Sequence, residues 1–147
     1  MFTFDKIIEI KTKEQFDIVD LTDKIKSFVA ESGIKNGLIN IQSLHTTAAV
    51  FVQENEPLLL KDIKIFLERI VPQSIKYNHD DFSHRTVNVC VDECRNGHSH
   101  CKALNLPTSV TLNLIDSKVQ LGTWQNILFI ELDRSRPRKI QVQILGE

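Results

Sequence analysis

The sequence predicts an α+β fold, with strands at both ends of the chain and two or three helices between them. Three observations carry this prediction. Residues 2–11 are apolar and rich in β-formers, and residues 139–145 alternate apolar with polar side chains. Between residues 57 and 71, apolar side chains recur at helical spacing. The chain has 147 residues, a length that suits one domain spanning 1–147.

The first third of the chain reads as strand, short strand, helix and strand. After residues 2–11, a short second strand is indicated by Phe16, Ile18 and Val19. A helix then begins at Asp20 or Thr22, either of which can cap it, and Gly33 stops it. Residues 38–44 follow as a strand.

Residues 44–55 form an apolar strand-like run with polar residues at each end. Residues 48–52 are apolar on both faces, as in a central strand. If the preceding strand is regular, His45 shares the inward face of Ile39 and Ile41. Polar groups beside a buried run need partners or a function, so we expect functional chemistry here.

The second half of the chain contains two more predicted helices and three strands. Pro57 suits the first turn of a helix whose core-facing seam would be Leu59, Ile63, Phe66 and Ile70. Residues 73–97 are polar and irregular. Asn96 or Ser99 would cap a short helix over 100–104. The strands that follow cover three ranges: 109–115, 127–133 and 139–145.

Composition excludes several classes of protein. Lys plus Arg number 18 and Asp plus Glu 19, so the net charge of −1 gives no basic footprint for nucleic acid. No apolar run approaches the roughly 20 residues of a membrane span, and the N-terminus lacks a signal-peptide pattern. We therefore expect a cytoplasmic protein that acts on neither nucleic acid nor membrane. The odd count of three cysteines (Cys90, Cys94, Cys101) favours reduced thiols over a disulfide framework.

Two histidine groups lie in the irregular region. His98 and His100 could both bind a metal from a strand, but on a helix they point about 200° apart and only one faces a given site. The local sequence looks helical, so we expect one of them at the site. His79 stands beside Asp80 and Asp81, which could orient its imidazole; the alternative is a polar surface loop.

Other candidates are spread along the chain, each with a structural alternative. His45 is either a ligand or a core histidine bonded to a carbonyl, and Glu54 is either functional or a charge favouring a helix N-terminus. Glu131 shares a strand face with apolar residues and so needs a cation, an Arg or a metal. The arginines of residues 134–138 either bind an anion such as phosphate or are solvated. Trp124 and Gln125 either stack on and hydrogen-bond a ligand, or Trp124 is simply a buried side chain near a turn.

These signals combine into a resemblance to a known family. The blocks that carry it are His45-Thr46-Thr47-Ala48-Ala49 with Glu54-Asn55, Tyr77-x-His79-Asp80, Asn96-Gly97-His98-Ser99-His100, Thr108-Ser109, and Leu121-Gly122-Thr123-Trp124-Gln125 leading to Glu131-Leu132-Asp133. In this order they resemble the YjbQ family, small proteins also called secondary thiamine-phosphate synthase enzymes. The resemblance runs from about Phe4 to Glu147.

The resemblance implies a largely antiparallel β-sandwich within the α+β class, usually assembled as a homotrimer. It also implies one polar pocket around three histidines that match His45, His79 and His100, a set that suits a divalent metal, zinc by preference. Glu54 and Glu131 would act as acid–base or supporting carboxylates. The residues expected to contact a phosphorylated small molecule are Thr46, Ser109, Gln125 and Arg136.

The implied activity joins a hydroxymethylpyrimidine pyrophosphate to a thiazole phosphate, and the metal and arginines would favour departure of pyrophosphate. The alternative is a non-catalytic trimeric module that binds a metal or small anion. The two differ in one structural expectation: an enzyme should keep Glu131 and the arginines beside the histidines.

Overall fold

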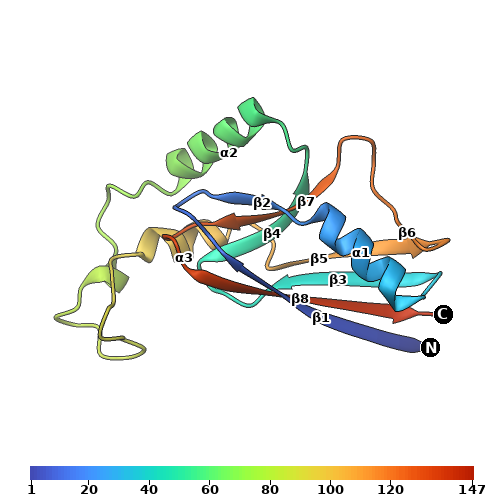
Figure 1. Cartoon of the computed structure of the whole chain (residues 1–147). Coiled ribbons are helices and arrows are strands. Elements are labelled where there is room, and N and C mark those ends of the chain that lie inside the picture. Colours follow the sequence, from blue (N-terminus) through green and yellow to red (C-terminus); the bar gives the residue numbers. More distant parts are fainter.

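The computed structural model describes residues 1–147 as two antiparallel sheets with three α-helices, which confirms the α+β prediction (Figure 1). The five-stranded sheet has the order β1 (Phe2–Lys11), β8 (Pro137–Gly146), β3 (Gly37–Ser43), β5 (Ser109–Ile115), β6 (Lys118–Val119). The three-stranded sheet has the order β2 (Ile18–Asp20), β7 (Asn126–Glu131), β4 (Ala48–Gln53). The helices are α1 (Thr22–Ser32), α2 (Pro57–Ile70), the 3-10 turn η1 (Asn78–Asp80) and α3 (Gly97–Ala103).

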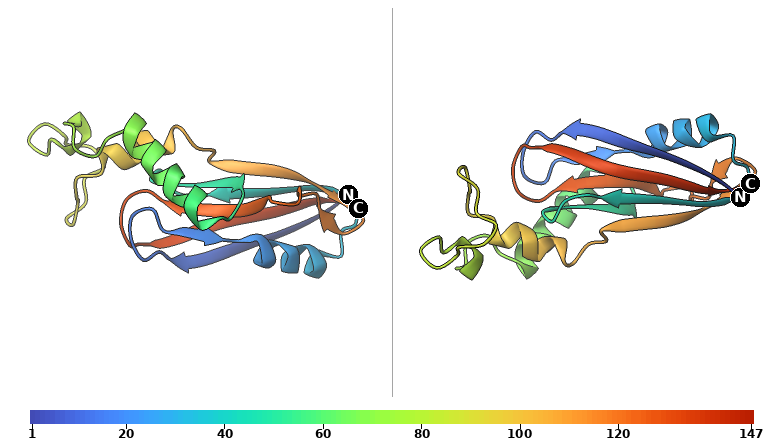
Figure 2. Two further views of the ribbon diagram at one scale, coloured as in Figure 1. Left: turned by 90° about the horizontal axis from the view of Figure 1, so that it is seen from above. Right: turned by 90° about the horizontal axis from the view of Figure 1, so that it is seen from below.

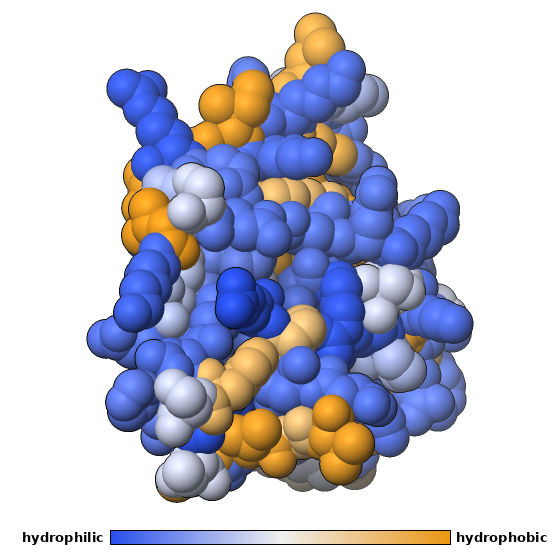
Figure 3. Space-filling view, turned by 90° about the vertical axis from the view of Figure 1, so that its left-hand side faces the viewer, coloured by the Kyte–Doolittle hydropathy of each residue, from blue (hydrophilic) through white to orange (hydrophobic).

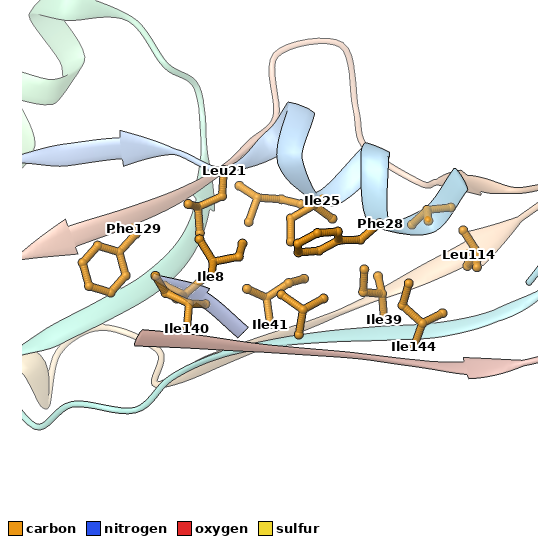
Figure 4. Packing of buried hydrophobic residues seen from close by; sticks show 14 of the residues in the cluster. Ile8, Leu21, Ile25, Phe28, Ile39, Ile41, Leu114, Phe129, Ile140 and Ile144 are labelled. Carbon is orange, nitrogen blue, oxygen red and sulfur yellow. The ribbon is translucent and has the colours of Figure 1, made fainter. Parts of the chain in front are cut away.

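The main hydrophobic core lies between the two sheets and under α1 (Figure 4). Isoleucines at alternate positions of β3 and β8 point into it, among them Ile39, Ile41 and Ile140, because successive strand residues face opposite sides. Ile25 and Phe28 of α1 close the core from the other side. From Ile127 to Glu131 every residue of β7 is buried, so this strand has a core on each face.

Turns and close contacts fix the registers. Asp116 and Ser117 have φ values of 49° and 60° between β5 and β6, the geometry of a tight hairpin turn. Gly37 lies opposite Gly146 in the β3–β8 ladder, and a Cβ on Gly37 would lie 1.9 Å from the carbonyl oxygen of Leu145. The β3–β8 pairing therefore requires glycine at this position.

Helix α2 meets the second, smaller core through a stripe of residues that shares only Ile63 with the predicted seam. Phe66 and Ile70 were expected inside, but they are 57% and 42% exposed. The stripe that packs against the protein is Leu60, Ile63 and Leu67, and only Leu67 is fully buried. Apolar residues occur on nearly every side of this helix, so their spacing fits more than one seam.

The strand preceding His45 also ends earlier than predicted. β3 stops at Ser43, which is buried with Ile39 and Ile41, whereas His45 lies beyond the strand and is half-buried. Its side chain therefore does not continue the inward face. The inward direction was predicted for His45 only if the strand stayed regular, and that condition is not met because β3 ends at Ser43.

Helices α2 and α3 pack against the smaller core, whereas the segment between them projects from the sandwich (Figure 2). It contains η1 and otherwise has only turns and irregular backbone. No helix in the chain combines the length and the apolar character that crossing a membrane requires.

Candidate functional site

The register of β4 and β7 separates the predicted site residues into two groups. Ala48 pairs with Glu131 at one end of the ladder, and Gln53 pairs with Asn126 at the other. At about 3.3 Å per residue, these ends lie roughly 17 Å apart. His45 and Glu131 therefore belong to one end, whereas Glu54 and Gln125 belong to the other. Within one chain, the sequence blocks predicted to line a single pocket therefore do not all meet.

Glu131 and Arg138 form a buried ion pair at the first end. Glu131 is completely buried and Arg138 is 4% exposed. The Nε of Arg138 donates to one carboxylate oxygen at 2.6 Å, and Nη2 donates to the other oxygen and to Thr47 Oγ1 at 3.0 Å. Thr12 and the Asp133 N–H also donate to the carboxylate, each at 2.9 Å. The prediction that Glu131 needs a cation is confirmed, and that cation is Arg138.

His45 lies next to this ion pair. Its Nε2 accepts a hydrogen bond of 2.7 Å from the Lys139 N–H, which leaves Nδ1 as the nitrogen that carries the proton in the neutral ring. Burial lowers the pKa of His45, and the positive charges of Arg138 and Arg136 lower it further against an opposing effect of Glu131. The imidazole is therefore held neutral near pH 7.

Asp133 collects the remaining arginines of the turn between β7 and β8. Its side chain is 4% exposed, and Oδ2 lies 3.1 Å from Arg136 Nη1 and 3.8 Å from Arg134 Nη1. Asn96 Nδ2 donates to the same oxygen at 3.3 Å, and Cys94 Sγ contacts Oδ1 at 3.8 Å. One buried carboxylate thus contacts both arginines, while more than a third of each arginine side chain stays exposed.

His79 of η1 and His100 of α3 face each other nearby. Their ring centroids are 4.5 Å apart with an interplanar angle of 60°. Burial lowers the pKa of His100, helped by His79 and Arg85 and opposed by Asp133 and Glu93. The sequence predicted that one histidine of the His98/His100 pair would face the site; His100 is the one that meets His79.

Three buried side-chain atoms in the protein have no hydrogen-bond partner: His79 Nε2, Asn96 Oδ1 and Arg134 Nη1. Asn96 and Arg134 both lie against Asp133, and Asp133 acts electrostatically on His100, which contacts His79. All three atoms therefore belong to one region, where η1, the start of α3 and the β7–β8 turn meet. Unpaired buried polar atoms are costly, so their concentration here marks a place for a ligand or ion.

The fit to a metal is partial. Two facing imidazoles, one of which has an unpaired nitrogen, are the donor type that zinc prefers. No three His, Cys, Asp or Glu side chains of the chain converge at a spacing that could hold a metal ion. His45, the third predicted ligand, instead uses Nε2 on the β8 backbone. A single chain thus presents a pair of ligands rather than a complete site.

His98 faces the opposite side of α3 and contacts residues that the sequence analysis missed. Lys102 is completely buried, and its Nζ lies 3.1 Å from His98 Nδ1 and 2.9 Å from Glu68 Oε1 on α2. Burial and the Lys102 charge lower the pKa of His98. Burial alone would raise the pKa of Glu68, but the bonds from Lys102 and Gln73 lower it. The sequence could have indicated this contact, because residues four apart on a helix, such as His98 and Lys102, lie on the same face.

At the second end of the β4–β7 ladder, Gln125 Oε1 accepts from the Gly122 N–H at 2.8 Å and so stabilises its own loop. Trp124 is 71% exposed, which excludes a buried structural role. Glu54 is half-buried and its carboxylate accepts no hydrogen bond from the protein, and the residue that caps α2 is Glu56. Thr46 and Ser109 are exposed, so both are accessible to a ligand.

Comparison with known proteins gives a consistent family. The model of the family described as "UPF0047 protein YjbQ-like" matches residues 6–147. A UPF0047 protein of Methanothermobacter thermautotrophicus is 35% identical over 100% of this chain and 95% of its own length. The UPF0047 protein YugU of Bacillus subtilis is 28% identical over 96% of this chain and 98% of its own length.

Solved structures agree with the sequence matches. A YbjQ-like protein of unknown function from Sulfolobus solfataricus superimposes with a TM-score of 0.88 at 35% identity, covering 99% of both chains. A hypothetical protein from Aeropyrum pernix gives a TM-score of 0.85 at 31% identity, covering 98% of this chain and 99% of its own. The fold and its topology are thus shared with these proteins along the whole chain.

Proposed function

Because the chain belongs to the UPF0047 protein YjbQ-like family, we propose that it is an enzyme of the secondary thiamine-phosphate synthase type. In this proposal, the region around His79 and His100 binds a divalent metal, most favourably zinc, and accepts phosphorylated small molecules. The observation that carries the proposal is the buried, unpaired Nε2 of His79 beside the neutral ring of His100.

His79 and His100 would hold the metal, with His45 as the third ligand after its ring leaves the Lys139 N–H. A bound metal would supply positive charge where a pyrophosphate leaving group becomes more negative. Two of the ligands are already neutral near pH 7, since the pKa values of His45 and His100 lie below the ordinary histidine value. Metal binding would therefore require little proton release from these rings.

Arg134 and Arg136 are the proposed contacts for phosphate. Asp133 contacts both guanidinium groups, and more than a third of each arginine side chain is exposed. The buried Nη1 of Arg134 has no acceptor, which a phosphate oxygen would provide. In the proposed reaction, the thiazole nitrogen attacks the pyrimidine methylene carbon, the C–O bond to pyrophosphate breaks, and the arginines bind the departing pyrophosphate.

Glu131 acts in this proposal by position rather than as a base. Both of its oxygens accept bonds from Arg138, Thr12 and the Asp133 N–H, so neither is free to take a proton. Its role is to fix the β7–β8 turn that carries the arginines. Glu54, whose carboxylate has no protein partner, is the better candidate for acid–base chemistry.

A homotrimer would complete the site. Glu54 and Gln125 lie at the end of the β4–β7 ladder away from the histidines, so a ring of copies packed head to tail would bring these ends together. Exposed apolar residues support such packing: Leu58 and Ile65 of α2 are each 64% exposed and Phe66 is 57% exposed. The end of the molecule that carries the projecting segment also shows separate hydrophobic patches on a mostly hydrophilic surface (Figure 3).

The alternative is a non-catalytic trimeric module that binds a metal or a small anion. One observation favours it: Glu54, the candidate acid–base residue, lies within one chain at the end of the β4–β7 ladder away from the histidines. A module of this kind would bind zinc at the same histidines without converting the two thiamine precursors.

The test measures thiamine phosphate formed from the pyrimidine pyrophosphate and the thiazole phosphate, with metal content determined on the same preparations. The variants are His45→Ala, His100→Ala and, as a control, His84→Ala. His84 is a suitable control because its side chain is 85% exposed and pairs only with its own loop. We expect about one metal per chain and product formation in the wild type and His84→Ala, as suits an open site with three protein ligands.

Loss of both metal and product in His45→Ala and His100→Ala supports the enzyme. Metal binding that depends on these histidines, without any product, supports the module. Equal rates in the wild type and both site variants contradict the proposed site.

A further inference from the structure

A cavity lined by His98 lies on the other side of α3 from His100. It measures about 830 Å³ and is formed by residues 73–77 and 80–83 together with Arg95 and His98. None of the three proposed metal ligands, His45, His79 and His100, lines this cavity. Its size is within the range of small-molecule sites, roughly 300–1,000 Å³.

His98 presents a fixed hydrogen-bond donor at this cavity. The ammonium of Lys102 is a donor only, and it contacts Nδ1 of His98 at 3.1 Å. Nδ1 must therefore accept, and the proton of the ring resides on Nε2. Gln15 Nε2 also approaches Nδ1, at 3.5 Å, which agrees with this assignment. Lys102 is buried and bonded to Glu68, so it cannot turn away to release the ring.

The charged groups of the cavity differ in how they are paired. Asp80 accepts the N–H groups of Asn96 and Gly97 at 2.9 and 2.8 Å. Asp81 is bonded to Ser83 and His84. The two cations that line the cavity, Lys76 and Arg95, form no ion pair with any carboxylate. The donors left for a ligand are therefore the His98 Nε2–H and these two positive charges.

Apolar side chains form the remaining wall. Ile75 and Phe82 line the cavity and are 55% and 42% exposed, and Tyr77 stands with its hydroxyl bonded to the Pro72 carbonyl at 2.6 Å. That bond fixes the Tyr77 ring as a flat surface beside His98, whose ring lies edge-on to it with centroids 6.4 Å apart.

We propose that this cavity is a second ligand site, separate from the His79–His100 pair, for a small aromatic molecule that bears a phosphate group. The ring stacks against Tyr77 and Phe82, and the phosphate accepts from His98 Nε2–H and from the two unpaired cations. Stacking alone would accept many different aromatic rings, so the contacts with the phosphate group provide the specificity.

Isothermal titration with phenyl phosphate tests the proposal, with inorganic phosphate and phenol as partial ligands. Phenyl phosphate is expected to bind at least tenfold more tightly than either part, because each part makes only one set of contacts. Removal of both cations by Lys76→Ala with Arg95→Ala should weaken phenyl phosphate severalfold and leave phenol unchanged.

Two variants of His98 separate its role toward the ligand from its role in the fold. In His98→Asn, the amide oxygen takes the place of Nδ1 and still accepts from Lys102, but nothing replaces the Nε2–H. In His98→Gln, the amide nitrogen takes the place of Nε2. We expect about tenfold or greater loss of phenyl phosphate affinity in His98→Asn, the cost of a hydrogen bond to a charged group, and much less in His98→Gln.

The variant His100→Ala tests whether this cavity is independent of the proposed zinc site. It should leave the affinity for phenyl phosphate unchanged even if zinc binding is lost. Three results would overturn the proposal: no phenyl phosphate binding to the wild type at millimolar concentration, equal affinity for phenol and phenyl phosphate, or wild-type affinity in His98→Asn. Circular dichroism confirms that each variant is folded before titration.

Discussion

Replacing Arg138 by methionine removes the only cation that contacts the Glu131 carboxylate. Methionine fills most of the same volume, so the change leaves little cavity. Glu131 would keep the hydrogen bonds from Thr12 and the Asp133 N–H, both neutral donors. Because Glu131 is completely buried, water cannot take the place of the guanidinium.

The expected loss of unfolding free energy is about 3–5 kcal/mol, the cost of leaving a buried charge without its partner. A double variant, Glu131→Gln with Arg138→Met, removes the charge as well. Its amide oxygen can still accept from the Asp133 N–H, so we expect a loss of only about 1–2 kcal/mol. The difference in unfolding free energy between the single and the double variant measures the cost of leaving the Glu131 carboxylate buried without its cation.

Equilibrium unfolding in urea measures both losses. Far-UV circular dichroism is the suitable signal, because the single tryptophan, Trp124, is 71% exposed and reports poorly on the core. At a slope of about 2 kcal/mol per molar urea, the single variant should lower the midpoint by roughly 2 M. Protein concentration is held fixed, since an oligomer would make the midpoint depend on it.

A loss below about 1 kcal/mol in Arg138→Met would refute the reasoning, because it would mean that Glu131 is hydrated or protonated without cost. So would a double variant as unstable as the single one.

The pKa values of His45, His98 and His100 lie below the ordinary 6.5, so as pH falls the unfolded chain binds protons first. Stability should be full above about pH 6.5 and fall below it, by at most about 1.4 kcal/mol per pH unit for each histidine, and a flat urea midpoint from pH 7 to 5 would contradict this. Gly37→Ala, whose Cβ meets a β8 carbonyl, should cost about 2 kcal/mol and lower Tm by several degrees; an unchanged melting curve would contradict that contact. Lys102→Met should cost about 1–3 kcal/mol by removing the contacts of Lys102 with Nδ1 of His98 and with Glu68, and wild-type stability would argue against those contacts.

Local patterns in the sequence predicted the parts of the fold that local physics decides. Alternation placed the strand over residues 109–115 and the last strand correctly, because one face of each lies on the core. On α3, the two-residue spacing of His98 and His100 correctly implied opposite directions, since the helical period sets them about 200° apart. The need of Glu131 for a cation followed from its apolar strand neighbours alone.

Other features depend on contacts that no short pattern contains. The seam of α2 was wrong at Phe66 because a helix with apolar residues on nearly every side has no unique buried face. The cap of α3 comes from Asp80, far along the chain, and the burial of Lys102 depends on Glu68 of another helix. The separation of Gln125 from the histidines follows from strand register, which only the pairing of β4 with β7 reveals.

A calorimetric zinc titration of the metal-free protein tests the central claim most directly. The wild type and His84→Ala should each bind about one zinc per chain, and His100→Ala should bind it at least a hundredfold more weakly or not at all. No zinc binding by the wild type, or equal affinity in all three proteins, would contradict a metal site at His79 and His100.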